Sequence, residues 1–228
     1  MKEKELKSLS GPIKLLQKSW KEYKTNAKTF ALILIAPAIL ELLFQYIFTT
    51  NNMSSITPLF AIILLIALLL VYIPILLWSN TTLYLCIVEK SSDWKKSYRK
   101  SLNKIMPLFL IGLLTVILVL GGLLLFIIPG IIFSVWFSLA PFVYFEQNKE
   151  GFNALAKSKE YVKGYWWSVF FRGLFILFVS IIVTVLFGLI TERLRIPPLH
   201  SIIALALTPI TILYNFELYR ELKNIHSD

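Results

Sequence analysis

One carboxyl group stands out in this sequence because it lies inside a long apolar segment. Glu41 falls just past the middle of residues 29–49, and Pro37, Glu41 and Gln45 follow one another at intervals of four. A helix places residues at this spacing on one face. A carboxyl group in hydrocarbon is costly and suggests a site that binds a proton or an amine, or lines a path. The alternative is a protonated or hydrogen-bonded acid that fixes helix packing. The sequence leaves both interpretations open.

A second charged residue, Arg172, lies about two turns into another apolar segment, and Glu146 stands at the inner end of the segment before it. An arginine at this depth can form an ion pair with a carboxylate or extend its guanidinium to the headgroup region. We therefore expect a structural ion pair between Glu146 and Arg172 or an extended Arg172 side chain. Substrate binding by Arg172 is a further interpretation.

Patterns of known catalytic sites are absent from the sequence. It contains no HExxH, GxSxG or P-loop motif, and His200 and His226 stand far apart. The two aspartates, Asp93 and Asp228, are too few for a site with hard oxygen ligands. The single cysteine, Cys86, excludes an intrachain disulfide and a cysteine-built zinc site. The sequence therefore predicts no catalytic residue, metal or cofactor.

The elements that carry these residues are those of a membrane protein. Hydrophobic residues make up 57% of the chain and charged residues only 16%, against about 25% charged in a soluble domain. Residues 42–88 and 107–145 contain no charged side chain, whereas about 18 apolar residues already suffice for a membrane-spanning helix. The net charge of +10 suits nucleic acid or an anionic membrane. We favour the membrane and exclude nucleic acid, because the basic residues lie between apolar segments.

We predict an all-α membrane protein with about six transmembrane helices arranged as three helical hairpins. The predicted spans are 29–49, 58–80, 107–127, 131–147, 167–190 and 199–219. The third and fourth are separated because one helix over 39 residues would be roughly 58 Å long, about twice the hydrocarbon thickness. Pro129-Gly130 is the expected turn between them. The transmembrane domain is thus 29–219, preceded by a basic amphipathic segment over 1–28 and followed by a tail over 220–228.

The distribution of basic residues predicts the orientation of the spans. Of the 23 lysines and arginines, 20 fall in segments that the span assignment puts on one side: 1–28, 89–106, 148–163 and 220–228. Only Arg193 and Arg195 fall on the other side. The positive-inside rule puts the basic side in the cytoplasm. We therefore expect a multi-pass protein of the cell membrane with both termini in the cytoplasm.

Three basic amphipathic segments precede the odd-numbered spans. The clearest, 90–105, alternates rings and apolar groups with cations and predicts a helix on the inner leaflet that contacts anionic lipid headgroups. Its candidate lipid-contacting residues are Trp94, Lys95, Lys96, Tyr98, Arg99, Lys100 and Lys104. The alternative is that these charges only set the topology and the segment packs on protein.

The three segments also resemble one another. Each contains a Lys-Ser pair, at Lys18-Ser19, Lys96-Ser97 and Lys157-Ser158, and a phenylalanine opens each following apolar run. The even-numbered spans end in Val88-Glu89, Phe145-Glu146 and Phe216-Glu217. We interpret this as three copies of one unit, an interfacial helix followed by a helical hairpin. The alternative is that any membrane hairpin needs aromatics, lysines and an apolar run at such places.

Three stretches of the chain form a pattern that extends over most of its length. They are Leu15-Leu16-x3-Trp20-x2-Tyr23-x2-Asn26, then Pro129-Gly130, Trp136, Ala140, Glu146, Gly151, Ala154-Leu155, Ser158 and Lys163-Gly164, and finally Leu213-Tyr214. In these residues the chain resembles the membrane domain found ahead of glycerophosphoryl diester phosphodiesterase catalytic domains, and related uncharacterised multi-pass membrane families. The resemblance implies a multi-helix membrane module. We do not expect the phosphodiesterase activity, because only nine residues, 220–228, follow the last predicted span.

The sequence thus favours a non-enzymatic membrane module that interacts with anionic inner-leaflet lipids or with other membrane proteins. The alternative function is a small transporter or export component in which Glu41 lines the path. An intramembrane enzyme is a third and less favoured interpretation, since histidine, aspartate and cysteine are scarce.

Overall fold

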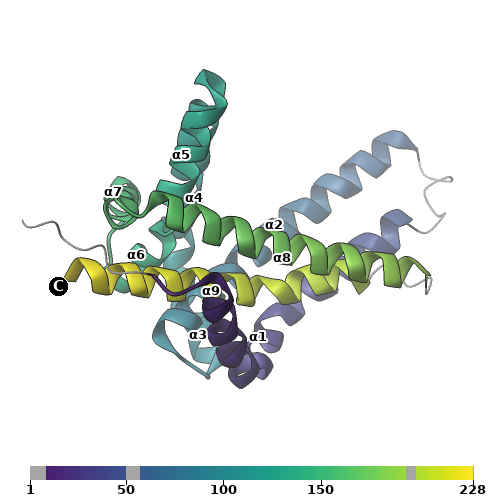
Figure 1. Cartoon of the computed structure of the whole chain (residues 1–228). Coiled ribbons are helices and arrows are strands. Elements are labelled where there is room, and N and C mark those ends of the chain that lie inside the picture. The colour runs from purple at the N-terminus through teal and green to yellow at the C-terminus, as the bar shows by residue number, and fades with distance from the viewer. Residues whose placement is uncertain (1–8, 50–56, 194–198, 228) are drawn as a thin grey trace, which may run out of the picture. The chain divides into compact units, whose positions relative to one another are not determined.

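The computed structural model describes residues 9–49, 57–193 and 199–227 and is helical throughout, with no strand among these residues (Figure 1). Its helices are α1 (Pro12–Thr49), α2 (Pro58–Glu89), α3 (Trp94–Ser101), the short 3-10 helix η2 (Leu102–Lys104), α4 (Ile105–Leu125), α5 (Ile127–Phe137), α6 (Ala140–Gln147), α7 (Gly151–Val162), α8 (Trp166–Arg193) and α9 (Leu199–Ser227). Among the described residues, six helical stretches are long and apolar enough to cross a membrane. The predicted all-α multi-pass fold is confirmed.

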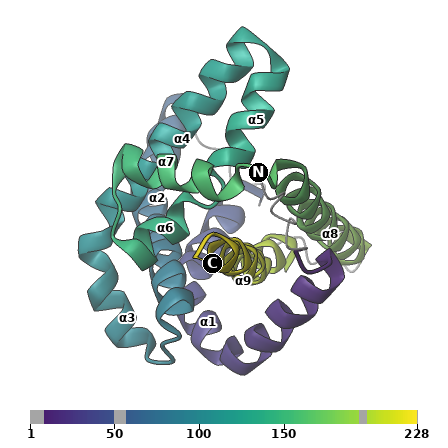
Figure 2. The same cartoon turned by 60° about the vertical axis from the view of Figure 1, so that its left-hand side comes forward.

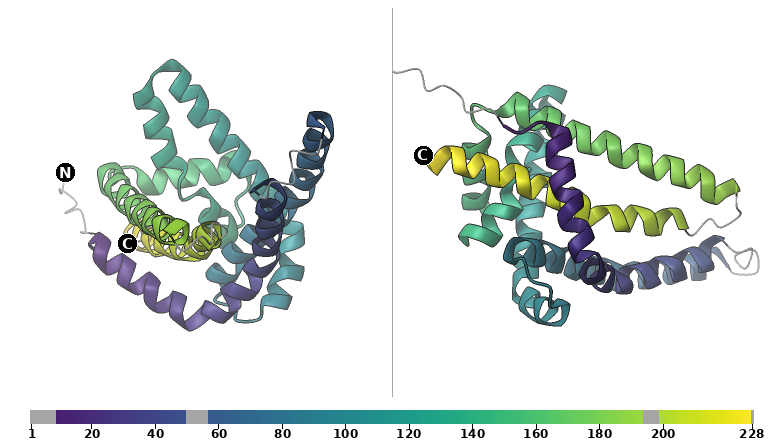
Figure 3. Two further views of the ribbon diagram at one scale, coloured as in Figure 1. Left: turned by 90° about the vertical axis from the view of Figure 1, so that its right-hand side faces the viewer. Right: turned by 60° about the horizontal axis from the view of Figure 1, so that its bottom comes forward.

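Four of these stretches are single helices, α1, α2, α8 and α9, and the other two combine shorter elements. Figure 3 shows the helices from two further sides, with α8 in green and α9 in yellow. The basic segment before the first span and the span itself form one helix, because Pro12 opens α1 and no proline or glycine interrupts it before Pro37. Proline suits a helix start since its missing N–H would be unpaired there in any case.

Helix α2 extends beyond the predicted span 58–80, since it continues to Glu89. Lys90 ends it in the left-handed conformation, with φ of 51°. The backbone N–H of Ser91 then returns to the carbonyl of Cys86 at 3.0 Å, as is common at helix ends. Asp93 starts α3 by accepting hydrogen bonds from the backbone N–H groups of Lys95 and Lys96. An Asp at this position satisfies donors that the first helical turn leaves unpaired.

The turn between the third and fourth spans lies at Phe126, so its predicted place at Pro129-Gly130 is wrong. Phe126 is extended, with φ of −161° and ψ of 154°, and both Pro129 and Gly130 lie within the first four residues of α5. Proline is tolerated there because these N–H groups have no partner inside the helix. Gly122 of α4 and Gly130 of α5 meet closely: a Cβ atom on Gly122 would lie 2.9 Å from the backbone nitrogen of Gly130. The hairpin of α4 and α5 is seen in Figure 2.

The predicted span 131–147 is also divided, because α5 ends at Phe137 and α6 begins at Ala140. Pro141, in the first turn of α6, accounts for the break: its nitrogen cannot donate to the carbonyl of Phe137. The other prolines within the spans, Pro37, Pro74 and Pro209, lie inside continuous helices.

The chain divides into two compact units. The first contains residues from 1–25, 106–178 and 210–228, and the second contains 26–105 and 179–209. In the first unit, α6 is almost entirely buried, and Phe142 packs against Phe216 and Tyr219 of α9 with ring centroids 5.6 and 5.8 Å away. In the second unit, α3 packs on α2 through small polar residues and one tyrosine.

Candidate functional site

The second unit brings the predicted polar pair Glu41 and Gln45 together with two side chains from other helices. The Gln45 amide nitrogen donates to a Glu41 carboxylate oxygen at 3.1 Å and to the Ser201 hydroxyl at 2.5 Å. The Tyr72 hydroxyl also forms a hydrogen bond with Glu41. Helices α1, α2 and α9 therefore all contribute to one intramembrane polar cluster, which we call the Glu41 cluster: Glu41, Gln45, Tyr72 and Ser201.

Two members of the Glu41 cluster were not predicted from the sequence. Tyr72 stands in an uncharged run, where a tyrosine is usually an interfacial ring, and Ser201 follows the proline pair near the start of the last span. All four residues are half-buried. In the described part of the chain no lysine or arginine forms an ion pair with Glu41. The Glu41 carboxyl group thus accepts hydrogen bonds from neutral side chains.

The basic segment 90–105 is bound to α2 by a polar contact. Ser97 and Ser101, on one face of α3, are both buried. The Trp78 indole nitrogen donates to the Tyr98 carbonyl at 3.1 Å and to the Ser101 hydroxyl at 3.0 Å, and the Thr82 and Ser101 hydroxyls lie 2.8 Å apart. Small side chains allow the close approach, and the hydroxyls satisfy one another away from water.

The Tyr98 hydroxyl also reaches a carbonyl that a proline leaves without its usual partner. It donates to the backbone oxygen of Ile33 at 2.6 Å, and residue 37, which would normally supply the helical N–H to this oxygen, is proline. The same hydroxyl lies 2.9 Å from the hydroxyl of Ser79. Tyr98, expected to contact lipid, instead joins α3 to α1 and α2, so for this residue the packing alternative applies.

The other predicted lipid contacts remain accessible. Lys95, Lys96, Arg99 and Lys100 are exposed, while Trp94 and Lys104 are half-buried. The Lys95 amine lies 5.6 Å from the centroid of the Trp94 ring, and Lys100 pairs with Glu89 at 2.6 Å. The docked α3 thus presents a row of cations on the side opposite its buried serines.

Glu146 and Arg172, the expected ion pair, have different partners in the first unit. Glu146 accepts hydrogen bonds from the Tyr219 hydroxyl at 2.6 Å and from the Lys223 amine at 2.8 Å. Arg172 donates to the backbone oxygens of Leu9, Ser10 and Ser168 at 2.8–3.0 Å. The Arg172 guanidinium therefore binds the chain just before α1, which accounts for its position without a substrate. Sequence spacing gave no sign of this contact, since more than 160 residues separate the partners.

The first unit also contains a network around Tyr219 near the end of α6. The Gln147 amide nitrogen donates to the Tyr161 and Tyr219 hydroxyls at 2.7 and 2.9 Å. On the neighbouring helix α7, Lys157 and Glu160 lie 2.7 Å apart, and the hydrogen bond from Lys157 lowers the pKa of Glu160 below its ordinary value. This network holds α6, α7 and α9 together and contains no arrangement of nucleophile and base.

The described residues contain no group of three or more His, Cys, Asp and Glu side chains that is able to hold a metal ion. Cys86 is buried, and its thiol donates to the backbone oxygen of Ser91.

No protein-family model, curated protein or solved structure matches the chain. The Glu41 cluster and the cation row of α3 are therefore the two features of the chain that bear on its function.

Proposed function

We propose that the protein is a non-enzymatic membrane module whose basic helix α3 binds anionic lipid headgroups on the cytoplasmic side. The observation that carries this proposal is the attachment of α3. Ser101 on the buried face of α3 forms hydrogen bonds with Trp78 and Thr82 of α2. These bonds fix the orientation of α3, so its exposed cations stay on the outer face. Lys95, Lys96 and Arg99 are exposed on the other face, and a cation near an anionic membrane surface contributes roughly 1 kcal/mol.

The orientation and the repeated organisation are part of the same proposal. The basic segments set both termini in the cytoplasm by the positive-inside rule. The three Lys-Ser pairs support a repeat, because Ser19, Ser97 and Ser158 are all buried. Two of them, Ser19 and Ser97, donate to the carbonyl four residues earlier, whereas Ser158 donates to the carbonyl of Trp136. The resemblance to the membrane domain of glycerophosphoryl diester phosphodiesterases agrees with a module of this kind.

A thermal-stability experiment with defined lipids tests the headgroup proposal. The purified chain in a neutral detergent is heated with added phosphatidylglycerol or phosphatidylcholine. We expect phosphatidylglycerol to raise the unfolding midpoint more, with a difference that shrinks in high salt because exposed charges are screened. A variant with Lys95, Lys96, Arg99 and Lys100 changed to Gln loses most of this difference.

The matched control removes four exposed lysines of α1 instead, Lys14, Lys21, Lys24 and Lys28, so that both variants have the same net charge. It keeps most of the phosphatidylglycerol effect if α3 is the binding surface. Equal stabilisation of the original chain by the two lipids, or equal losses in the two variants, contradicts the proposal.

A second candidate function is a small transporter or export component, favoured by the Glu41 cluster. Three helices place polar side chains around one carboxyl group in an otherwise apolar region, and such residues commonly mark a proton or ion path. Proton uptake into vesicles, measured with a trapped pH-sensitive dye under a potassium-diffusion potential, tests this function. Uptake that is lost in Glu41→Gln supports it, and vesicles no more permeable than protein-free ones refute it for protons.

A further inference from the structure

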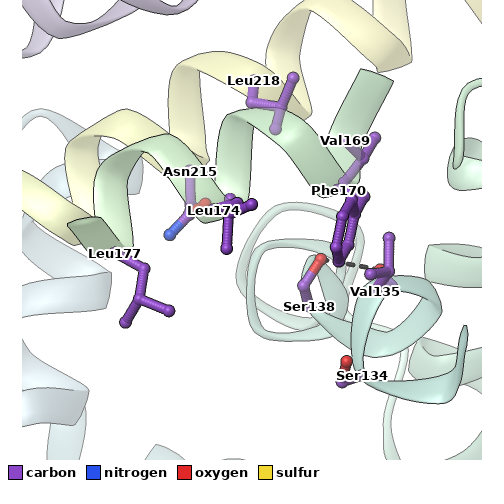
Figure 4. A pocket seen from close by; sticks show the side chains of 10 residues that line it. Ser134, Val135, Ser138, Val169, Phe170, Leu174, Leu177, Asn215 and Leu218 are labelled. Atoms are coloured by element: carbon purple, nitrogen blue, oxygen red, sulfur yellow. Dashed lines mark hydrogen bonds between the residues drawn. The ribbon is translucent and has the colours of Figure 1, made fainter. Parts of the chain in front are cut away.

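The first unit contains a partly open pocket of about 220 Å³ between α5, α8 and α9 (Figure 4). Most of its wall is apolar, with Val169, Phe170, Leu174 and Leu177 on α8. Gly173 lies in the same wall, and a Cβ atom added there would meet no other atom within 4 Å. The pocket therefore owes part of its space to a missing side chain.

Three polar side chains face this apolar pocket, Ser134, Ser138 and Asn215. Each already uses a hydrogen on a nearby carbonyl: Ser134 donates to Ile131, Ser138 to Val135, and the Asn215 amide nitrogen to Thr211, at 2.8–3.0 Å. What the two serines have left toward the pocket is oxygen lone pairs, whereas Asn215 keeps its amide oxygen and one N–H. No cation is among the lining residues, so the walls do not suit an anionic headgroup.

An apolar pocket lined with hydrogen-bond acceptors selects for a molecule that is apolar and also donates a hydrogen bond. A hydrocarbon would leave the serine and asparagine oxygens unpaired, at a cost in free energy when water is excluded. A ketone or ether can accept from the remaining N–H of Asn215, but it still leaves the serine oxygens without a donor. A hydroxyl group supplies the donor, and its apolar chain fills the wall formed by α8.

We propose that this pocket binds a single-chain membrane-soluble alcohol, with its hydroxyl donating to Asn215, Ser134 or Ser138. A cavity of about 150 Å³ already holds benzene, so the pocket takes the hydroxyl end and the first part of the chain. The rest of the chain leaves through the open side into the bilayer. This site is separate from the cation row of α3 and independent of the function proposed above.

The alcohol and its methyl ether form a matched pair of probes, because the ether has nearly the same apolar body and cannot donate. We use 8-bromooctan-1-ol and 1-bromo-8-methoxyoctane with the full chain in detergent. Bromine quenches tryptophan fluorescence at short range, and Trp166 is suitably placed, since its ring stacks on Phe170 of the pocket wall with centroids 5.1 Å apart. Quenching is measured as a function of probe concentration in the original chain and in Trp166→Phe. The quenching that is lost in Trp166→Phe comes from Trp166 and reports binding in the pocket.

The alcohol is expected to bind about tenfold more tightly than the ether, which is the effect of one net hydrogen bond. Gly173→Leu fills the pocket and abolishes the Trp166-dependent quenching by both probes. Asn215→Leu and the double variant Ser134→Ala/Ser138→Ala keep the apolar wall and test the acceptors separately. The variant that removes the acceptor used by the hydroxyl makes the alcohol and the ether bind with equal affinity. If Asn215→Leu does not fold, the serine double variant is the one compared. Equal affinities in the original chain, or quenching unchanged by Gly173→Leu, overturns the proposal.

Discussion

At residue scale, the chain satisfies a carbonyl that Pro37 leaves without a donor by means of a hydroxyl from a distant helix. Lipid offers no hydrogen bond to such a group, so membrane helices tolerate proline where a neighbour supplies one. Tyr98 is that neighbour, donating to Ile33 from α3. The basic helix α3 and the proline of the first span are therefore linked through a single hydroxyl group.

The first prediction is that Tyr98 and Pro37 are coupled energetically. Tyr98→Phe keeps the ring but removes the donor, so it lowers the free energy of unfolding by about 1 kcal/mol. Pro37→Ala restores the N–H that pairs with Ile33 inside the helix. In that background Tyr98→Phe costs less, and the difference is the coupling energy.

Unfolding by SDS in mixed micelles, followed by circular dichroism, measures each corner of this cycle. Tyr165→Phe is the control, because the Tyr165 hydroxyl has no hydrogen-bond partner among the described residues. It should change stability little. If Tyr98→Phe lowers the free energy of unfolding equally in the original chain and in the Pro37→Ala background, the Tyr98 hydroxyl does not stabilise the protein through the Ile33 carbonyl.

The second prediction concerns the charge that the Glu41 cluster tolerates. Glu41→Gln keeps an oxygen that accepts from Gln45 and Tyr72 and removes the carboxylate, so folding is maintained to within about 1 kcal/mol. Glu41→Lys places a cation in an apolar region with donors facing it, and the protein should fail to fold. Size-exclusion profiles and detergent unfolding curves of the two variants compare them. Unfolded Glu41→Gln protein would mean that an ionised carboxylate with a cationic partner is needed.

At element scale, the hairpin of α4 and α5 depends on two glycines that bring the helix backbones together. The third prediction is that Gly122→Ala destabilises the protein by about 1–3 kcal/mol, because its Cβ would meet the backbone of Gly130 and the ring of Phe133 at 2.9 Å. The neighbouring Gly121 has open space around it. Gly121→Ala is therefore neutral, or stabilising by up to about 1 kcal/mol, since alanine favours the helix.

The same SDS unfolding assay separates these two variants, which differ by one position and carry the same substitution. Similar stabilities for both would mean that the two helices do not approach each other at Gly122 in the folded protein. If helix propensity alone determined the outcome, Gly122→Ala would raise the free energy of unfolding. A decrease therefore shows that close packing against α5 determines its effect.

The long apolar helices could be predicted from the sequence, whereas several of their ends could not. Uncharged runs fix a membrane span because hydrocarbon excludes charge. The turn was misplaced because Pro129-Gly130 resembles a turn, although proline also fits the first turn of a helix. The sequence places Ser79, Thr81 and Thr82 near the inner boundary of the second span, and in the structure they are buried within α2.

At the scale of the whole molecule, the candidate site could be predicted only in part. Glu41 and Gln45 were found because they share one helix face. Tyr72 and Ser201 come from other helices, and their proximity depends on tertiary packing that no local pattern encodes. The same holds for Arg172, whose partners lie near the other end of the chain. Local periodicity predicts elements, and polar contacts between distant elements require the structure.

The last prediction concerns the orientation of the molecule in the membrane. The basic segments predict that residues 89–106 and 148–163 face the cytoplasm and that the loop near residue 52, which lies outside the described residues, faces the exterior. Cys86→Ser provides a background without thiols, and serine keeps a donor for the carbonyl of Ser91. Asn52→Cys in this background should react with a membrane-impermeant maleimide in intact cells, because the reagent reaches only the exterior.

Two positions that are predicted to face the cytoplasm test the opposite side. Ser92 and Lys149 are exposed, and Lys149 is a better choice than Asn148, whose φ of 53° suits a cysteine poorly. Ser92→Cys and Lys149→Cys should react only after the membrane is opened. Since 20 of 23 basic residues support this arrangement, the reverse labelling pattern would place α3 and its cation row outside the cell. In that case Lys95, Lys96 and Arg99 could not contact the anionic lipids of the inner leaflet, and the proposed headgroup binding would be wrong.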